Sequence, residues 1–314
     1  MLAIVGDMTE PIAYLNGDWV PFSAARLSVA DLGIVQAATV TEMIRTFGHR
    51  PFRVDEHLAR LRHSLEVTGI ADVAIVEPLS DVIDRIVREN SQLISPADDL
   101  GIVVIVTAGL QPMYAGGNRN DLPTVCVHTF PLPFARWADR YTDGVHLIVP
   151  SVRAMPVDVI DPRIKYRSRL HWFLADREVR KSDLAAMALL ADDQDQLTET
   201  NSGNLILFDG ERLMTPPASR VLGGISQQVV FELAERCGIS RQQRDITMAD
   251  VTSANEVFVS STTYCLLPAT RINDQPIGDG NIGPLFSELI NDWSDLVGTD
   301  ILSQAQQAGR NTNS

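Results

Sequence analysis

The sequence predicts an α+β protein of about two domains. At 314 residues the chain is longer than one ordinary domain, and its length suggests roughly two. Apolar runs typical of buried strands mix with amphipathic stretches typical of helices, but the two do not alternate strictly. That mixture favours an α+β fold over a doubly wound parallel sheet.

Composition and charge restrict the partners of the chain. Hydrophobic residues make up 45% and charged residues 21%, which is ordinary for a globular protein. The formal net charge of -14 argues against non-specific binding to nucleic acid or to anionic membranes. The longest strongly apolar run, "GIVVIVTAGL", is too short to cross a bilayer as a helix. We therefore expect small-molecule ligands, with no nucleic-acid partner and no membrane partner.

Cysteine usage and the first residues indicate a cytoplasmic protein. Cys126, Cys237 and Cys265 lie far apart and show no metal-ligand spacing, so we expect free thiols and no bound metal. The opening "MLAIVGDMTEP" lacks the basic region and the long apolar core of a secretory signal. Both observations favour a reducing compartment.

The first half of the chain contains signals of both strands and helices. Asn16-Gly17 stands between apolar flanks and is a strong hairpin signal, because both turn positions need positive φ. A helix is expected over residues 55–69, with three leucines as its buried stripe: Leu58, Leu61 and Leu65. A second helix follows at about 79–88, and "GIVVIVTA" and "PTVCVHTF" indicate buried strands.

A stretch rich in chain breakers suggests where the domains divide. Residues 131–144, "PLPFARWADRYTDG", combine prolines with polar residues and form our candidate linker. We assign residues 1–133 to a smaller N-terminal domain, 134–145 to the linker and 146–314 to a larger C-terminal domain.

The second half mixes strands and helices in the same way. Its expected elements are a strand in "VHLIVPS", a helix at about 168–181, a strand in "LAAMALLA", a hairpin turning at Asp209-Gly210, a helix at 225–237, a strand in "EVFVSST" and a helix at about 284–296. The tail "SQAQQAGRNTNS" looks frayed.

The stretch "DPRIKYRSRLHW" places cations on alternate residues of an acidic chain. They are Arg163, Lys165, Arg167, Arg169 and His171. Repulsion disfavours such a run unless water solvates it or it faces an anion. On these residues alone two interpretations stay open: a solvated basic face, or an anionic ligand beside a reactive lysine.

Three further segments have small, hydroxyl or acidic residues where strands end or helices begin. "LGGISQQ" places Ser226 at a helix start, where free N–H groups can hold a phosphate. "VSSTTY" offers four serine and threonine hydroxyl groups, and "LTETNSGNL" carries Glu199 between a buried strand and a hairpin. Each segment also has an ordinary interpretation as a cap, a turn or a solvated loop.

Together these segments resemble the class IV aminotransferase family, the fold-type-IV enzymes that use pyridoxal 5'-phosphate. The most specific match is "TETNSGNLILFDGERLMTPPASRVLGGIS", while "FRVDEHLARLRHS" matches the family's His-x-x-Arg-Leu segment and "VSSTT" its late phosphate-binding turn. The resemblance covers about residues 13–280. It implies a small N-terminal α+β domain, a larger barrel-like C-terminal domain and a homodimer.

The resemblance also implies roles for single residues. Lys165 matches the Schiff-base lysine, whose amine can also move the substrate's α-proton. Glu199 matches the carboxylate that pairs with the pyridine nitrogen of the cofactor. Four residues match phosphate-binding positions: Arg60, Ile225, Ser226 and Thr262. Without the resemblance, Arg60 would be interpreted as a surface arginine paired with Glu56 at i,i+4.

The sequence departs from the family where substrate is recognised. In "DLGIVQAATVTE" the family's Gly-Asp-Gly is replaced, and Thr41 stands in place of an aromatic residue, which implies a smaller and more polar pocket wall. "LQPMYAGG" lacks the Arg-x-His carboxylate trap of D-amino-acid aminotransferases. The Gly-Asn-Tyr of branched-chain enzymes is absent after the lysine, and Gln227 replaces an arginine. No subfamily pattern fits the pocket.

An amino-acid substrate still carries a carboxylate that must be bound. Arg169 shares the face of Lys165 whether the segment is extended or helical, so we expect it to contact that carboxylate. The alternative is a surface arginine paired with Asp176 or Glu178. Backbone donors around Thr263 are the second candidate for carboxylate recognition.

These observations favour a pyridoxal-phosphate-dependent aminotransferase. It would pass the amino group of an amino acid to a 2-oxo acid, with branched-chain amino acids as one candidate substrate class. Two alternatives stay open: a carbon–oxygen lyase of the aminodeoxychorismate type, and a cofactor-binding homologue with little turnover. Glu42 favours the aminotransferase, because lyase members of the family can have threonine at that position.

Overall fold

The computed structural model describes residues 10–116 and 122–312. The chain divides into two compact units: unit 1 is Met1–Leu132 with Ile164–Ser168, and unit 2 is Pro133–Arg163 with Arg169–Ser314. Residues 1–9, which we expect not to be a secretory signal, lie outside the described residues. Across the two described ranges, every helix is too short or too polar to cross a membrane.

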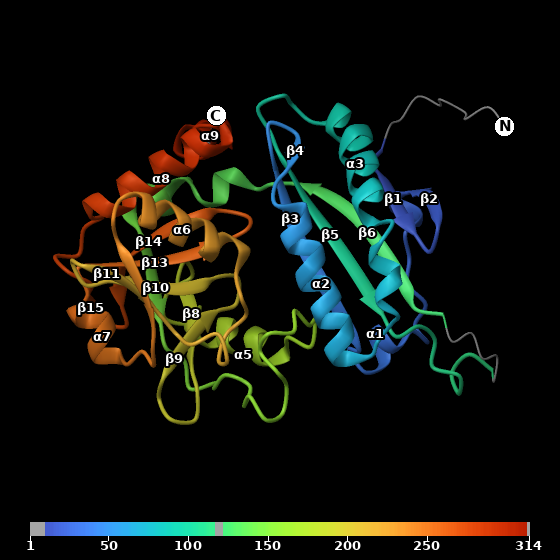
Figure 1. The fold of residues 1–314 in the computed structure, drawn as a ribbon, viewed down its shortest axis with the longest axis horizontal. Coiled ribbons are helices and arrows are strands. Elements are labelled where there is room, and N and C mark those ends of the chain that lie inside the picture. Colours follow the sequence, from blue (N-terminus) through green and yellow to red (C-terminus); the bar gives the residue numbers. More distant parts are fainter. Residues whose placement is uncertain (1–9, 117–121, 313–314) are drawn as a thin grey trace. The chain divides into compact units, whose positions relative to one another are not determined.

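Unit 1 is built on a six-stranded sheet with strand order β2-β1-β6-β5-β3-β4, in which every pairing is antiparallel (Figure 1). Its elements are β1 (Ile12–Leu15), β2 (Asp18–Pro21), η1 (Phe22–Ala24), α1 (Leu32–Val35), β3 (Thr39–Phe47), β4 (Arg50–Pro51), α2 (Val54–Thr68), η2 (Val73–Val76), α3 (Leu79–Asn90), η3 (Ser91–Leu93), β5 (Leu100–Thr107) and β6 (Thr124–Pro131). Helices α2 and α3 cover one face of the sheet, and an apolar cluster fills the space between them.

The expected hairpin and helices of unit 1 are confirmed. Asn16 and Gly17 have φ of 53° and 101° and join β1 to β2, as the turn requires. Helices α2 and α3 occupy the two stretches that the apolar periodicity indicated. Strand β3 was not predicted, because the polar residues along it obscure the strand pattern.

Unit 2 contains a sheet that closes on itself. Strands β10-β13-β14-β7-β8-β9 are paired in that order, and β9 pairs back to β10. The elements are η4 (Phe134–Arg136), α4 (Ala138–Asp143), β7 (Val145–Ile148), α5 (Leu170–Val179), β8 (Met187–Ala191), β9 (Leu197–Thr200), β10 (Asn204–Phe208), β11 (Arg212–Thr215), α6 (Ile225–Arg236), β12 (Ser240–Gln243), α7 (Met248–Ser253), β13 (Glu256–Ser261), β14 (Cys265–Ile272), β15 (Gln275–Pro276), α8 (Pro284–Val297) and α9 (Ile301–Thr312). This closure confirms the α+β class and the barrel-like second half.

The tail is a helix, and the prediction that it is frayed was wrong. Helix α9 starts after Asp300, whose carboxylate accepts hydrogen bonds from the N–H and the hydroxyl of Ser303. Ile301 and Ala305, four residues apart, are buried. A Cβ at Gly309 would lie 2.9 Å from Cβ of Ala138, so α9 packs closely on α4. Small residues make this contact, and they carry little hydrophobic signal.

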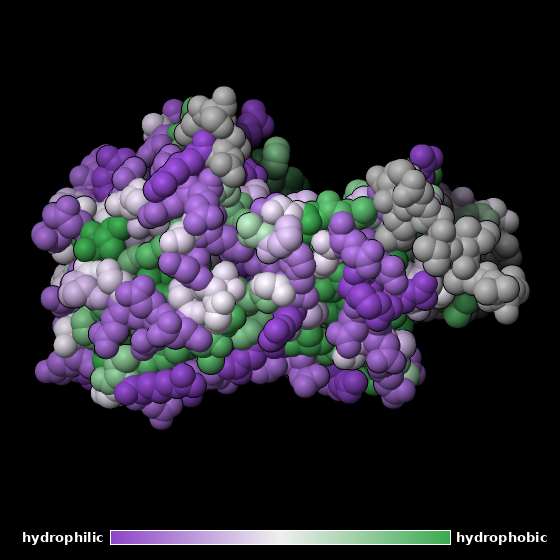
Figure 2. All heavy atoms as spheres, turned by 90° about the horizontal axis from the view of Figure 1, so that it is seen from above, coloured by the Kyte–Doolittle hydropathy of each residue, from purple (hydrophilic) through white to green (hydrophobic). Residues whose placement is uncertain are grey.

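The segment expected to link the domains is ordered. Residues 134–145 contain η4 and α4, and their aromatic residues Phe134, Trp137 and Tyr141 are buried within unit 2. The cysteines are free, as expected: Cys126 and Cys265 are buried, and Cys237 is partly exposed. Hydrophilic side chains cover most of the face of the molecule shown in Figure 2, in keeping with the chain's 40 acidic and 26 basic residues.

Candidate active site

A polar row runs along the buried side of α2 in unit 1. His57, Arg60 and Ser64 follow one another at helical spacing, beside the leucine row that the sequence predicted. Arg60 does not pair with Glu56, so that interpretation was wrong: Glu56 pairs with Arg53 at 2.8 Å. The helix therefore buries two adjacent rows, one apolar and one polar.

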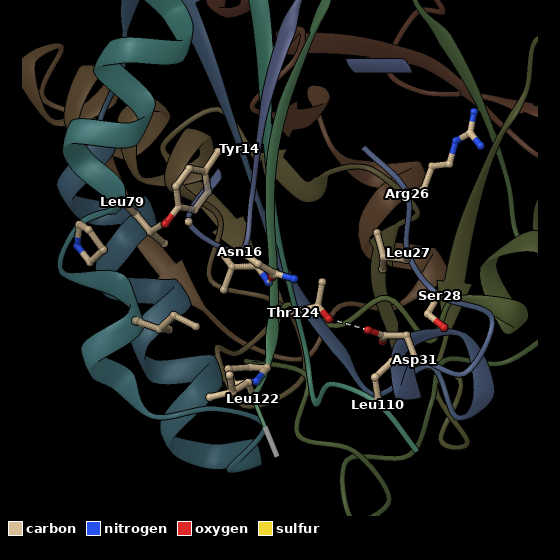
Figure 3. A pocket seen from close by; sticks show the side chains of 15 residues that line it. Tyr14, Asn16, Arg26, Leu27, Ser28, Asp31, Leu79, Leu110, Leu122 and Thr124 are labelled. Atoms are coloured by element: carbon tan, nitrogen blue, oxygen red, sulfur yellow. Dashed lines mark hydrogen bonds between the residues drawn. The ribbon is translucent and has the colours of Figure 1, made fainter. Parts of the chain in front are cut away.

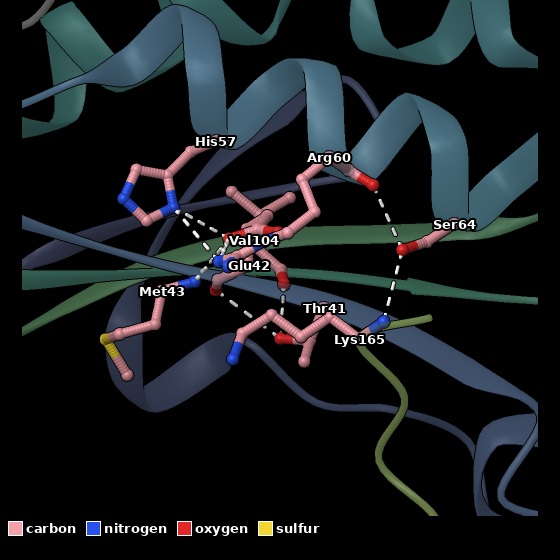
Figure 4. Close-up of polar contacts among 8 residues, drawn as sticks. All are labelled: Thr41, Glu42, Met43, His57, Arg60, Ser64, Val104 and Lys165. Atoms are coloured by element: carbon pink, nitrogen blue, oxygen red, sulfur yellow. Dashed lines mark hydrogen bonds and ion pairs between the residues drawn. The ribbon is translucent and has the colours of Figure 1, made fainter. Parts of the chain in front are cut away.

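Two residues of this row, His57 and Arg60, contact the carboxylate of Glu42 in β3. Arg60 donates from Nε to Oε1 at 2.8 Å and from Nη2 to Oε2 at 2.7 Å, and Nδ1 of His57 lies 2.8 Å from Oε2 (Figure 4). The side chain of Glu42 has no exposed surface, and those of His57 and Arg60 are 2% and 11% exposed. A buried carboxylate with three such contacts is well compensated.

Electrostatics assign the charges in this cluster. Burial alone would raise the pKa of Glu42, but the charge of Arg60 and the hydrogen bonds from Arg60 and His57 outweigh it and hold that pKa well below its usual range. Burial lowers the pKa of His57, and the nearby cations Arg60 and Lys165 add to this effect. Glu42 is therefore ionised and His57 is neutral at neutral pH, and the Nδ1–H of His57 donates to the carboxylate.

The segment that carries Lys165 lies beside β3 and is joined to it by an isolated bridge. The N–H of Thr41 donates to the carbonyl of Lys165 at 2.9 Å, and the N–H of Arg167 donates to the carbonyl of Thr39 at 3.1 Å. Val40 and Tyr166 form the bridge between them. The N–H of Lys165 also donates to Oγ of Ser64 at 3.2 Å, which ties the lysine to α2 (Figure 4).

The basic residues around Lys165 alternate with apolar residues that face the core of unit 1. Ile164 and Tyr166 pack in the apolar cluster of unit 1, so Lys165 and Arg167 lie on the opposite face. Arg163 forms an ion pair with Asp161 and is 56% exposed. The run therefore combines a solvated ion pair at its start with a bridged segment around Lys165.

Thr41 lies opposite Lys165 in this pairing and is buried. Its hydroxyl donates to the carbonyl of Val104 at 2.7 Å, across the β3–β5 pair. The hydroxyl of Thr41 is thus bonded to the sheet, and no pattern in the sequence indicated that bond.

In unit 2, Asn204 connects Glu199 to the start of α6. Oε2 of Glu199 accepts hydrogen bonds from Nδ2 of Asn204 at 3.2 Å and from the N–H of Leu222 at 3.3 Å. Nδ2 of Asn204 also donates to the carbonyl of Leu222 at 2.7 Å. A Cβ at Gly224 would collide with Oδ1 of Asn204, so glycine is needed there.

Helix α6 begins directly after Gly224, with Ile225 and Ser226 in its first turn. The first N–H groups of a helix have no carbonyl one turn earlier to donate to, so they are available to an anion. Gln227 points away from this end: its amide donates to Oγ1 of Thr215 at 2.8 Å inside the core. The glutamine that stands in place of the family's arginine therefore forms part of the core of unit 2.

Thr262 and Thr263 form the turn between β13 and β14. Ser260 of β13 pairs with Asn204, and Asn204 pairs with Glu199 in the next strand. The turn, the carboxylate of Glu199 and the start of α6 therefore gather at one end of unit 2. The sequence analysis presented these parts as three separate segments, two with donors for an anion and one with a carboxylate.

Arg169 is the residue that precedes α5 in unit 2. Its guanidinium donates to the carbonyl of Asn201 and lies 5.6 Å from the ring centroid of Trp172. The amide of Asn201 in turn donates to the carboxylate of Asp176. Asn201 thus links Arg169 to Asp176, one of the two acids named in the alternative.

Sequence reasoning missed several residues of these two clusters. His57 was part of a quoted motif but received no role, and Ser64 and Asn204 received none either. Asn204 could have been found, because an amide five residues after Glu199 in a tight hairpin has a nearby carboxylate to bond. His57 and Ser64 could not, because their partners, Glu42 for His57 and Lys165 for Ser64, are distant in sequence.

Unit 1 also contains a cavity of about 550 Å³ at another place (Figure 3). Its lining includes Tyr14, Leu79 and Leu122, with Arg26 near the rim, and none of the residues around Glu42 or Lys165 lines it. The cavity is therefore separate from the polar cluster.

A two-unit fold with a closed sheet, a buried ion-pair cluster around Glu42 and a polar cluster around Glu199 is the arrangement to be compared with known proteins. The model for the family described as "Amino-transferase class IV" matches residues 39–272. The chain belongs to the class IV aminotransferase family.

Similar proteins carry related names. A Methanocaldococcus jannaschii protein, named provisionally as a branched-chain-amino-acid aminotransferase, is 28% identical over 284 residues, which are 90% of this chain and 95% of that protein. The D-alanine aminotransferase of Staphylococcus epidermidis is 26% identical over 277 residues, covering 88% and 94%. The crystal structure of the Escherichia coli branched-chain amino acid aminotransferase aligns with a TM-score of 0.83 at 23% identity, covering 92% and 95%, so the fold is shared.

Proposed function

We propose that this protein is a pyridoxal-5'-phosphate-dependent aminotransferase that passes the amino group of an amino acid to a 2-oxo acid. Family membership supports this activity, and so does the small number of lysines that could bind the cofactor. The chain has only two lysines, Lys165 and Lys181. The carbonyl and the N–H of Lys165 are both hydrogen-bonded, to the N–H of Thr41 and to Oγ of Ser64, whereas Lys181 follows the end of α5 and is exposed. The ordered Lys165 segment is the observation that carries the proposal.

The residues of both units fit the cofactor chemically. We propose that the N–H groups of Ile225 and Ser226, the hydroxyl of Thr262 and the guanidinium of Arg60 bind its phosphate. The close approach of Gly224 to Asn204 leaves the start of α6 without a side chain that could block an anion. Glu42 accepts hydrogen bonds from Nε and Nη2 of Arg60, and this two-point contact fixes the orientation of the guanidinium plane.

The chemistry divides between two residues. When bound, the cofactor supplies a protonated ring that delocalises the electron pair left when the substrate loses its Cα proton. Glu199, anchored by Asn204 and Leu222, keeps the proton on the ring nitrogen. Lys165 holds the cofactor and then, as a free amine, takes the Cα proton and returns it at the acceptor carbon.

Substrate recognition is proposed for Arg169, Thr263 and Thr41. Arg169 already donates to the carbonyl of Asn201, so a carboxylate would share its guanidinium with that contact. Arg169→Ala should raise KM for amino acids and leave turnover of a simple amine nearly unchanged. Equal losses for both would mean that Arg169 supports the loop at Asn201 instead, and carboxylate binding would then fall to the backbone around Thr263.

The substrate class is proposed from the named relatives. Branched-chain amino acids lead, because the Methanocaldococcus jannaschii relative and the aligned Escherichia coli structure carry that name. D-alanine is the second class, named for the Staphylococcus epidermidis relative. None of these proteins is named as a lyase, so the aminodeoxychorismate alternative is not favoured. A cytoplasmic homodimer is also proposed, from the family resemblance.

The test is a panel of L- and D-amino acids with 2-oxoglutarate, read by glutamate formation, with Lys165→Ala as the control. The proposal expects glutamate from at least one amino acid with the wild-type protein and none with the variant. Release of pyruvate from aminodeoxychorismate without glutamate formation would contradict it in favour of the lyase.

A further inference from the structure

Tyr264 is buried next to the two segments of unit 2 that carry Glu199 and the threonine turn. It follows Thr263 directly, is 3% exposed and packs edge-on against Trp137, with ring centroids 5.9 Å apart. Its carbonyl accepts a hydrogen bond from the hydroxyl of Tyr141 at 2.5 Å. Tyr264 is therefore fixed at its ring and at its backbone.

The phenol of Tyr264 reaches across to the loop that follows Glu199. It lies 3.1 Å from Oγ of Ser202 and also interacts with the side chains of Thr200 and Ser261. A Cβ at Gly203 would lie 2.7 Å from the phenol oxygen, so the loop packs directly onto it. One hydroxyl group thus joins the loop 200–203 to the end of β13.

The loop itself depends on short polar contacts. Oγ1 of Thr200 accepts hydrogen bonds from the N–H of Gly203 at 2.9 Å and of Ser202 at 3.4 Å. Thr200 is the neighbour of Glu199, so a shift of this loop moves the carboxylate. The phenol of Tyr264, which bonds several polar groups, holds such a loop in one arrangement better than apolar packing alone would.

We propose that Tyr264 is a positioning residue that sets the distance between the carboxylate of Glu199 and the hydroxyl groups of Thr262 and Thr263. The inference rests on the proposed function, because both groups must contact the same cofactor for their spacing to matter. A tyrosine that served only to fill the core could be replaced by phenylalanine with no effect on the cofactor.

The test measures the dissociation constant of pyridoxal 5'-phosphate by absorbance titration of the apo protein, together with the apo protein's Tm. Tyr264→Phe keeps the ring and removes the hydroxyl. We expect the dissociation constant to rise about tenfold, the size of one or two buried hydrogen bonds. Tyr14→Phe is the matched control, because Tyr14 lines the separate cavity of unit 1, away from the residues around Glu42 and Lys165, and the affinity of this variant should equal the wild-type value.

A second variant keeps the test decisive if Tyr264→Phe folds poorly. Ser202→Ala removes one partner of the phenol from an exposed position, and we expect a smaller loss of affinity in the same direction. The double variant should then lose less than the product of the two single effects, because both changes break the same contact.

The outcomes separate the two levels of inference. Wild-type protein that does not bind pyridoxal 5'-phosphate would contradict the proposed function itself. Wild-type protein that binds it, with Tyr264→Phe and Ser202→Ala binding equally well, would overturn only the role of Tyr264. A lower Tm of apo Tyr264→Phe with unchanged affinity would also overturn it, since the residue would then be purely structural.

Discussion

Arg60 donates two hydrogen bonds to the carboxylate of Glu42, from Nε to Oε1 at 2.8 Å and from Nη2 to Oε2 at 2.7 Å, although the two residues belong to different elements of unit 1. Helix α2 provides the arginine and β3 the glutamate. Because Glu42 has no exposed surface, water cannot replace either partner. The arginine proposed to bind phosphate is thus oriented by a residue that need not touch the cofactor.

Glu42→Gln should destabilise the protein by about 3–5 kcal/mol, because it leaves the charge of Arg60 buried and uncompensated. Urea denaturation of the apo protein measures this. Glu56→Gln is the matched control: Glu56 is 41% exposed and paired with Arg53, so its loss should cost at most about 1 kcal/mol. Equal stability of the two variants would contradict the importance of the buried pair.

Acidification should weaken the fold through His57 first. The pKa of His57 is lowered below the ordinary 6.5 by burial, so below that pH the unfolded chain binds a proton that the folded protein does not. The free energy of unfolding should therefore fall as pH decreases from 6.5. It should fall further below 4.5, the ordinary pKa of a glutamate, because the unfolded chain then binds a proton that the buried Glu42, with its lowered pKa, does not. His57→Asn can still donate to Glu42 and should flatten the first part of the curve. An unchanged slope would mean that the pKa of His57 is the same in the folded and the unfolded chain, which would contradict this prediction.

Gly224→Ala should impair cofactor binding, because its Cβ collides with the side chain of Asn204, which holds Glu199. Gly223→Ala is the matched control next to it, since a Cβ there meets nothing within 4 Å. Titration with pyridoxal 5'-phosphate should show a loss of affinity of tenfold or more, about 1.4 kcal/mol, for the first variant alone. Parallel losses in both would indicate a general sensitivity of the loop.

Glu199→Gln should keep the fold and the bound cofactor but slow the removal of the Cα proton. Glutamine has the shape of glutamate without the charge that keeps the ring nitrogen protonated. Stopped-flow measurement should show a loss of about a hundredfold or more, ~2.7 kcal/mol. A rate equal to wild type would make Glu199 an ordinary loop carboxylate that bonds Asn204.

The sequence predicted the fold well where local signals decide it. Asn16-Gly17 indicated the hairpin, leucine spacing indicated α2, and the expected helix at 225–237 is α6. It failed for α9, whose packing relies on small residues such as Gly309 and Ala138. Propensity and periodicity register large apolar side chains, and close contacts between small ones leave no such pattern.

The candidate site was predictable in unit 2 and only partly in unit 1. Glu199 and Asn204 are neighbours in one hairpin, so short-range pairing brings them together. The contact of Glu42 with Arg60 joins residues 18 positions apart through a strand that the sequence did not reveal. The role of Tyr264 depends on a contact with Ser202 across 62 positions, which no local pattern encodes.

The most direct test of the account is chemical mapping of the cofactor lysine. Purified protein is incubated with pyridoxal 5'-phosphate, reduced with borohydride, digested and analysed by mass spectrometry. The chain offers only Lys165 and Lys181, so each molecule carries its own internal control. The account predicts the reduced cofactor on Lys165, with Lys181 unmodified at stoichiometric cofactor. Modification of Lys181 instead, or of both lysines equally, would contradict it.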